Sequence, residues 1–182
     1  MKITFYSWFS ATLVFCLFTM GSNATYAREE KVAEEIQAQF IMNYVPYTKW
    51  PRSVRKSGDP VTVCVMDGDL TAVYLRKSNE NRNKQYSMRV KEKDKKSDFS
   101  ECHILYLSSS YESTKEYVIG ATKGKPILTI SDIKGFAKSG GITGFQVTPG
   151  KDVTLEVNME SLRASAVEID SDLLSIMKII KK

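Results

Sequence analysis

The residues best suited to catalysis in this sequence are four acids, Asp67, Asp69, Asp132 and Glu156, which are candidates for a carboxylate pair. Two carboxylates can act as general acid and general base when their environments separate their pKa values. Asp67 and Asp69 flank Gly68 at the end of an expected strand, a position where α/β folds often place function. The same residue types also form tight turns, and for these two aspartates we favour the turn.

Other catalytic signatures are missing from the sequence. His103 is the only histidine, which leaves little material for general base catalysis near neutral pH. No Gly-x-Ser-x-Gly motif occurs. The stretch Gly120-x-x-x-Gly124-Lys125 lacks the length and the Ser or Thr of a phosphate-binding loop. We therefore predict that the chain is not an enzyme and uses no cofactor.

The cysteines give a clearer signal than the acids. Three are present, and Cys16 lies in an N-terminal segment that we expect to be removed, which leaves Cys64 and Cys102. An even pair in an exported protein is most simply a disulfide. The competing interpretation is a metal site built from both cysteines and His103, but such a site needs a fourth ligand. We predict a Cys64–Cys102 bridge and no metal.

Export itself is predicted from residues 1–27. Lys2 is followed by an apolar stretch that is densest from Phe9 to Met20 and then gives way to small residues. This order defines a secretory signal peptide, with cleavage expected after Ala24 or Ala27. An uncleaved anchor helix is one alternative, although several Ser and Thr residues dilute the run. A lipid-modified Cys16 is another, although Phe15 occupies a place that requires a small residue.

The remaining residues, 28–182, are expected to form one domain with its own core. The full sequence has a formal net charge of +5, and its basic residues concentrate at 49–56 and 76–96. Asn, Glu and Asp are mixed among the lysines of the second stretch, which is typical of a solvated loop and strand face. Outside the cytoplasm we expect no nucleic-acid partner.

Helix and strand patterns alternate along the first part of this domain. A first helix that ends near Pro46 is predicted because apolar residues recur every four positions, at Val32, Ile36, Phe40 and Tyr44. Strands are predicted at 61–65, 86–90, 103–107 and 126–130, with helices at 70–77 and 108–121. The almost continuous apolar run at 103–107 is typical of a strand buried on both faces. Strands separated by helices in this way predict βα crossovers.

The last third of the chain changes character. Residues 142–148 and 152–158 flank a Pro149-Gly150 turn and predict an antiparallel hairpin, followed by a short helix at 159–166. Ser171-Asp172 is expected to cap a final helix, whose apolar face would comprise Leu173, Leu174, Ile176, Met177 and Ile180. The predicted fold is therefore a single layered α/β domain. It has a central mixed β-sheet flanked by helices, a C-terminal β-hairpin and terminal helices.

Several stretches in combination resemble one known family. They are ISDIKGFAKSGGITGF at 130–145, VTLEVN at 153–158 with Leu162, Ala164 and the SDLL helix start, and QFIMNY and TKWP within 39–51. Cys64 between valines and CHILY at 102–106 match the places where relatives carry a disulfide. Over essentially the whole expected mature chain, the sequence resembles the YfiR family of periplasmic regulatory proteins.

The resemblance implies a function based on binding. YfiR-like proteins inhibit an inner-membrane diguanylate cyclase through its periplasmic sensor region, and an outer-membrane OmpA-like lipoprotein takes part in their release. We therefore expect a periplasmic repressor that lowers cyclic di-GMP and biofilm formation. A homodimer is a further candidate assembly. The alternative is a periplasmic sensor module that binds a small molecule or a peptide and has a different output.

The binding surface suggested by the sequence is the loop from Phe136 to Phe145 with the hairpin and Leu162. Apolar residues on a Gly-Gly loop can present a patch to a partner or enclose a ligand. The alternative is that these residues only build the fold, with the glycines allowing a tight backbone and the phenylalanines in the core. The candidate binding residues are Phe136, Gly140, Gly141, Ile142, Phe145 and Leu162. Asn158 is expected to cap the next helix.

Overall fold

The computed structural model of the chain describes residues 33–81, 87–147 and 153–181. The predicted signal peptide, residues 1–27, and the predicted Pro149-Gly150 turn lie outside these ranges. No helix within the described ranges is long and apolar enough to cross a membrane. The N-terminal helix is described over residues 33–44 and gives way to a 3₁₀ turn, η1 (Val45–Tyr47), which contains Pro46, so the helix ends near Pro46 as predicted.

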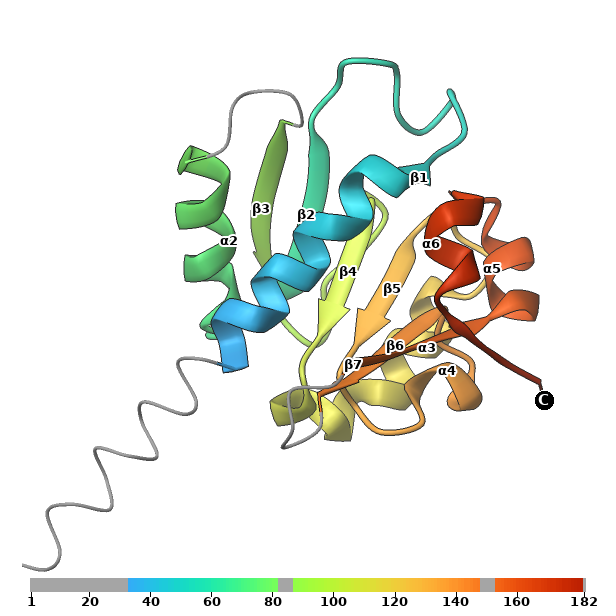
Figure 1. The fold of residues 1–182 in the computed structure, drawn as a ribbon. Helices are drawn as coiled ribbons and strands as arrows, with labels where there is room; N and C mark the ends of the chain where they lie inside the picture. The colour runs from blue at the N-terminus through green and yellow to red at the C-terminus, as the bar shows by residue number, and fades with distance from the viewer. Residues whose placement is uncertain (1–32, 82–86, 148–152, 182) are drawn as a thin grey trace, which may run out of the picture.

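A seven-stranded mixed sheet forms the centre of the molecule (Figure 1). The first five strands are parallel, β7 is antiparallel to β6, and β9 is parallel to β7. In order across the sheet they are β3 (Met88–Lys93), β2 (Val61–Met66), β4 (Ile104–Leu107), β5 (Leu128–Ser131), β6 (Thr143–Val147), β7 (Val153–Asn158) and β9 (Lys178–Ile180).

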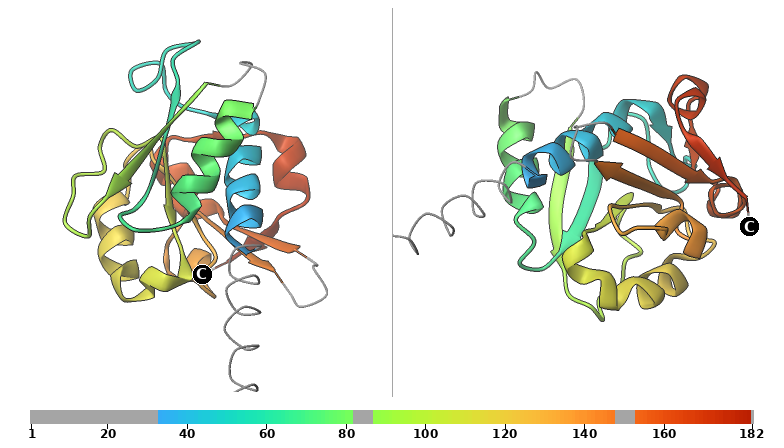
Figure 2. Two further views of the ribbon diagram at one scale, coloured as in Figure 1. Left: turned by 90° about the vertical axis from the view of Figure 1, so that its left-hand side faces the viewer. Right: turned by 60° about the horizontal axis from the view of Figure 1, so that its bottom comes forward.

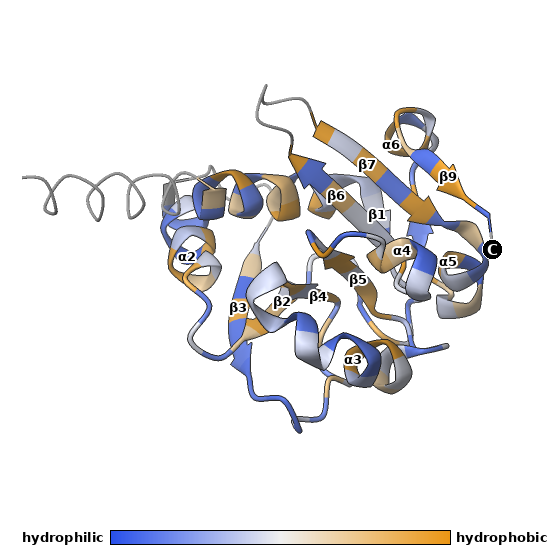
Figure 3. Ribbon diagram, turned by 90° about the horizontal axis from the view of Figure 1, so that it is seen from below, coloured by the Kyte–Doolittle hydropathy of each residue, from blue (hydrophilic) through white to orange (hydrophobic). Residues whose placement is uncertain are grey.

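Helices cover both faces of this sheet, as the two views of Figure 2 and the view from below in Figure 3 show. The N-terminal helix and α2 (Thr71–Asn81) lie on one face, and η2 (Ser109–Thr114), α3 (Lys115–Thr122) and α4 (Phe136–Ser139) lie on the other. The short helices α5 (Met159–Ser165) and α6 (Ser171–Ser175) follow the hairpin. The prediction of a layered α/β domain with a mixed sheet is confirmed.

Alternation along the central strands builds a separate core on each face. Side chains two apart on a strand share a face. Ile104 and Tyr106 therefore belong to the core under the N-terminal helix, whereas Leu105 and Leu107 belong to the core under α3. All four residues are fully buried, which confirms the prediction of a strand buried on both faces.

The predicted disulfide joins strand β2 to the segment that enters the neighbouring strand β4. Cys64 lies in β2, and Cys102 lies two residues before β4 begins. Their Cα atoms are 5.7 Å apart, and both residues are buried in the core under α3. His103, which follows Cys102, packs against the ring of Trp50 at 5.5 Å between ring centroids. The predictions of the bridge and of a packed histidine are both confirmed.

Two predictions about the C-terminal segment are wrong. The hairpin of β6 and β7 and the helix α5 are present as expected, but the final helix does not reach Ile180. It ends at Ser175, and residues 178–180 form strand β9 on the open edge of β7. Pairing satisfies backbone groups that the edge leaves open, and this outweighs the helical spacing of a short apolar run. The helix cap is Asp170, whose Oδ1 accepts from the Asp172 backbone N–H, and not Ser171.

A small second sheet also escaped prediction. Strand β1 (Thr48–Lys49) pairs antiparallel with β8 (Glu168–Ile169), and each strand has only two residues. Segments this short carry no periodicity that could identify them. The pairing matters for the rest of the molecule, because it fixes the chain after the N-terminal helix against the chain before α6.

Candidate functional site

The six residues suggested by the sequence do not form an exposed patch. Phe136, in α4, is fully buried in the core under α3. Ile142, Phe145 and Leu162 are buried in the core on the other face, and Gly141 is buried as well. Only Gly140 is partly exposed. The structure therefore assigns these side chains to the fold, and their contact with a partner stays a prediction.

The Gly-Gly pair allows a close approach of the backbone to Phe136. A Cβ atom built at Gly141 would overlap the ring of Phe136. Gly140 ends α4 with a φ of +115°, a backbone conformation that residues other than glycine rarely adopt. The helix α4 was predicted as part of a loop, because four residues between glycines give no helical pattern.

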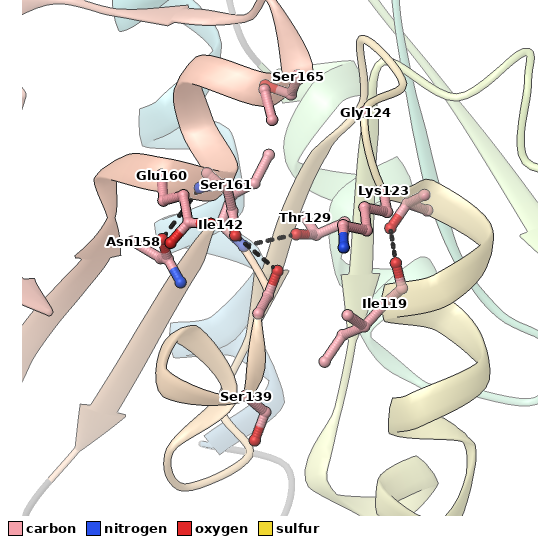
Figure 4. A pocket seen from close by; sticks show the side chains of 13 residues that line it. Ile119, Lys123, Gly124, Thr129, Ser139, Ile142, Asn158, Glu160, Ser161 and Ser165 are labelled. Carbon is pink, nitrogen blue, oxygen red and sulfur yellow. Dashed lines mark hydrogen bonds between the residues drawn. The ribbon is translucent and has the colours of Figure 1, made fainter. Parts of the chain in front are cut away.

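A small cavity of about 120 Å³ lies beside this pair, between α3, the end of α4 and α5 (Figure 4). Its polar side chains already bond within the protein. Asn158 accepts from the Ser161 backbone N–H at 3.0 Å, which confirms its predicted role as a cap. Ser161 donates to the Gly140 carbonyl at 2.8 Å, and Thr129 accepts from the Ile142 N–H at 2.8 Å. These bonds join three elements of the fold and leave little for a ligand.

A larger and more apolar groove lies between the N-terminal helix, β7 and α6. Its volume is about 390 Å³. The lining residues, which we call the C-terminal groove, are Phe40, Asn43, Tyr44, Tyr47, Leu155, Asp172, Leu173 and Ile176. An apolar floor with a few polar groups at its border is the usual form of a binding site for a small molecule or an anchoring side chain.

Local sequence explains how the groove is built. Phe40 and Tyr44 are four residues apart and therefore share a face of the N-terminal helix. Thr48 donates its hydroxyl to the Tyr44 carbonyl at 2.7 Å, which closes the helix end. Beyond the β1–β8 pair, the Asp170 backbone N–H donates to the Tyr47 carbonyl at 2.8 Å. This contact holds α6 opposite the helix and so defines the second wall of the groove.

The floor of the groove rests on one of the residues suggested by the sequence. Phe40 stacks on Phe145 with ring centroids 5.4 Å apart, and Phe145 in turn stacks on Tyr106 at 6.2 Å. Phe145 therefore supports the groove from beneath and does not line it. Burial raises the pKa of Tyr44 to about 12, so its phenol stays neutral at physiological pH.

Two side chains of the groove remain well exposed although they are apolar. Tyr47 is 42% exposed and Ile176 is 68% exposed. Ile179, on the edge strand β9, is 57% exposed. The sequence pattern placed Ile176 on the apolar face of a helix that was expected to reach Ile180. Because α6 ends at Ser175, Ile176 lies beyond the helix and at the surface. Apolar side chains that gather on one surface commonly mark an interaction site.

The remaining acidic, basic and cysteine residues of the described ranges bear on metal binding and on anion binding. No group of three or more His, Cys, Asp or Glu residues there is arranged to hold a metal ion. Within the basic stretch at 76–96, Arg76 pairs with Glu92 at 2.6 Å, and Lys91 and Lys93 both pair with Glu101. These acids balance part of the stretch, so its lysines and arginines are not all free to bind an anion.

Comparison with known structures supports the fold. A crystal structure of a conserved domain protein from Vibrio cholerae O1 biovar El Tor shares 13% sequence identity, with a TM-score of 0.55. The match covers 81% of this chain and 60% of the solved chain, so the chain spans less than two thirds of the length of that relative. At this identity the likeness concerns the fold alone. The comparison with curated proteins found no match.

Comparison with protein families shows which family the chain belongs to. The model of a family described as YfiR/HmsC-like matches residues 34–178, which include both cysteines, the Gly-Gly segment and the C-terminal groove. The match extends over almost all the described structure and confirms the resemblance seen in the sequence. The family is regulatory and not catalytic. This chain belongs to the YfiR/HmsC-like family.

Proposed function

We propose that the mature chain is a periplasmic repressor of an inner-membrane diguanylate cyclase. Membership of the YfiR/HmsC-like family is the observation that carries the proposal. In this function the chain binds the periplasmic sensor region of the cyclase and lowers cyclic di-GMP, which reduces biofilm formation. An OmpA-like lipoprotein of the outer membrane would relieve the repression by taking part in the release of the chain.

The C-terminal groove is the surface we assign to the cyclase. Interfaces combine an apolar centre with a polar border, and a few large anchors supply most of the binding energy. Phe40, Tyr44 and Leu173 provide the centre, and Asn43 and Asp172 provide polar groups beside it. The occupant we propose is an apolar side chain of the sensor region, because an apolar anchor fits a groove of this lining best.

Repression through this groove is a matter of binding equilibria. A bound protein can shift its partner between two states only by the difference in its affinity for them. To move a partner from almost fully active to almost fully inactive, the chain must bind the inactive state roughly 10⁴-fold more tightly. The proposal therefore requires that groove contacts exist in the inactive state of the cyclase and are lost or weakened in the active state.

Direct binding tests the assignment of the groove. The purified chain without residues 1–27 is titrated with the purified periplasmic region of an inner-membrane diguanylate cyclase from the same organism. Ile176→Glu places a charge in the groove and should weaken binding at least about tenfold, as expected for an anchor contact. Val73→Glu is the matched control, because Val73 is an apolar residue of α2, 54% exposed and outside the groove.

The two variants separate the outcomes. The groove is supported as the binding surface if Ile176→Glu weakens binding while Val73→Glu leaves the affinity within twofold of the wild type. Equal affinity for both variants would show that the sensor region binds elsewhere. No binding of the wild-type chain would reject the proposed partner.

A further inference from the structure

A second cavity lies at the carboxyl ends of the parallel strands, where the chain direction across the sheet reverses. From β2 the chain passes through α2 to β3 on one side, whereas from β4 it passes through η2 and α3 to β5 on the other. The segments that leave β2 and β4 therefore diverge, on opposite faces of the sheet (Figure 2). Open α/β sheets bind their ligands in the crevice at such a point.

This crevice is a defined space of about 290 Å³, at the lower end of the range for small-molecule sites. It lies between the start of the N-terminal helix and the segments after β2 and β4. The residues that line it are Ala33, Glu34, Gln37, Gly68, Asp69, Leu70, Ser108, Ser109, Ser110 and Tyr111. None of these described lining residues is Lys or Arg.

A chain of hydrogen bonds holds the crevice in shape. Asp132 accepts from the Ser109 backbone N–H at 2.7 Å and from the Gln37 amide at 3.0 Å. The Gln37 carbonyl oxygen accepts from the Thr71 hydroxyl at 3.1 Å. The Thr71 backbone N–H donates to Asp69 Oδ1 at 2.9 Å. Groups from four separate segments are therefore fixed around one space, which is the support a binding site needs.

One atom of this arrangement has no partner. Asp69 is only 8% exposed, and its Oδ1 is used by Thr71, but its buried Oδ2 makes no hydrogen bond. A buried carboxylate oxygen without a partner is costly, and exceptions of this kind call for an explanation. A bound donor would satisfy Asp69 Oδ2 and remove the cost.

The negative charge around the crevice favours a positively charged hydrogen-bond donor. The backbone N–H groups that begin α2 and η2 would attract an anion, but Asp69 and Asp132 already occupy one such group each. The pKa of the buried Tyr106 phenol is raised, first by burial and then by the charges of Asp132 and Asp69. This neighbourhood is negative, although the sequence as a whole has a net charge of +5.

We propose that this crevice binds a small organic cation with a protonated primary amine, which donates a hydrogen bond to Asp69 Oδ2. The hydroxyl groups of Ser109 and Ser110 lie at the same space and supply further acceptors. An ammonium group with three donors matches this set of acceptors. The proposal is independent of the repressor function, because it concerns a different surface.

The test uses putrescine and spermidine as probes, with the chain lacking residues 1–27. Either amine should raise the melting temperature and shift the amide signals of Thr71 and Ser109 in ¹⁵N-labelled protein. Magnesium chloride and inorganic phosphate are measured at the same ionic strength. Asp69→Asn removes the charge but keeps an oxygen for Thr71, so this variant should fold. It should bind the amines at least about fivefold more weakly than the wild type.

The matched control is Asp59→Asn. Asp59 is exposed, its Oδ2 accepts from the Lys56 backbone N–H at 3.1 Å, and it precedes β2 at the opposite end of the strand. The same charge is lost, so amine binding should stay within twofold of the wild type. Without ligand, Asp69→Asn should melt at the same or a higher temperature, because it removes an unpartnered buried charge.

Three results would overturn the proposal. One is that neither amine shifts the wild-type signals at millimolar concentration. Another is that Asp69→Asn binds the amines as well as the wild type does. The last is that magnesium or phosphate produces the same shifts at Thr71 and Ser109, because the site would then recognise a metal ion or an anion.

Discussion

At Gly141 the local packing depends on the absence of a Cβ atom. Replacement by Ala would place a methyl group within the ring of Phe136, which is fully buried. Overpacking of this kind costs about 1–3 kcal/mol. We therefore expect Gly141→Ala to lower the free energy of unfolding by that amount in a urea titration.

Gly120 provides the control for this prediction. It lies in α3, is exposed, and has no atom within 4 Å of a built Cβ. Gly120→Ala should stabilise the protein by about 0.5–1 kcal/mol, because glycine is a poor residue for a helix interior. If both variants change stability equally, the close approach at Gly141 is not what fixes the loop.

His103 makes the stability of the fold depend on pH. Its Nδ1 accepts from the Thr62 backbone N–H at 2.8 Å, so the ring must be neutral at that atom. Burial lowers the pKa of His103 below its usual 6.5, and the Arg55 and Arg89 charges add to this effect. The unfolded chain then binds a proton more readily than the folded chain does, and His103 destabilises the fold as the pH falls below about 6.5.

His103→Asn tests this dependence. The Asn side-chain oxygen can accept from Thr62 as Nδ1 does, but it does not titrate. Urea unfolding at pH 7 and pH 5 should show a smaller loss of stability for the variant than for the wild type. An equal loss in both proteins would mean that His103 does not contribute to the pH dependence.

At the scale of elements, the disulfide connects β2 to the segment that enters β4, and the chain direction across the sheet reverses between these two strands. The bridge closes a loop with a sequence separation of 38 residues. In the chain-entropy model such a loop contributes about 3–4 kcal/mol. The double variant Cys64→Ser, Cys102→Ser should therefore melt roughly 10 °C lower under oxidising conditions.

Reduction of the wild-type protein is the control for the bridge. After unfolding and refolding in a reductant, the wild type should melt within a few degrees of the double serine variant. A wild-type melting temperature that matches the variant's without any reductant would show that the bridge does not form or does not stabilise the fold.

The central elements could be predicted because their residue types indicate a buried strand or the end of a helix. β-branched runs such as residues 61–65 have few alternatives to a buried strand, and Pro46 can hardly lie within a helix. The strand β9 could not be predicted, because Lys178–Ile180 is ordered by the edge of β7 and not by its own pattern. The sequence periodicity at the C-terminus favoured a helix for this reason.

The candidate sites depend even more on contacts that the sequence does not display. The Gln37–Asp132 hydrogen bond joins residues 95 positions apart. The C-terminal groove exists because β1 pairs with β8, two strands of two residues each. The sequence left two roles open for Phe145, contact with a partner or a place in the core, and the structure places it in the core under Phe40 as the support of the groove.

At the scale of the whole molecule, the N-terminal helix connects two surfaces. Phe40 and Tyr44 line the C-terminal groove, and Gln37, on the same helix, lines the crevice at the switch point of the sheet. The molecule therefore presents two candidate binding surfaces that share one helix, in keeping with a regulatory family.

Cellular cyclic di-GMP, measured after deletion of the gene, is the most direct test of the repressor proposal. Deletion should raise the level when the partner cyclase is expressed. Wild-type protein and Val73→Glu should restore the low level, whereas Ile176→Glu, at an equal amount in the periplasm, should not. An unchanged level of cyclic di-GMP after deletion, with the cyclase present, would contradict the proposal that this chain is a repressor.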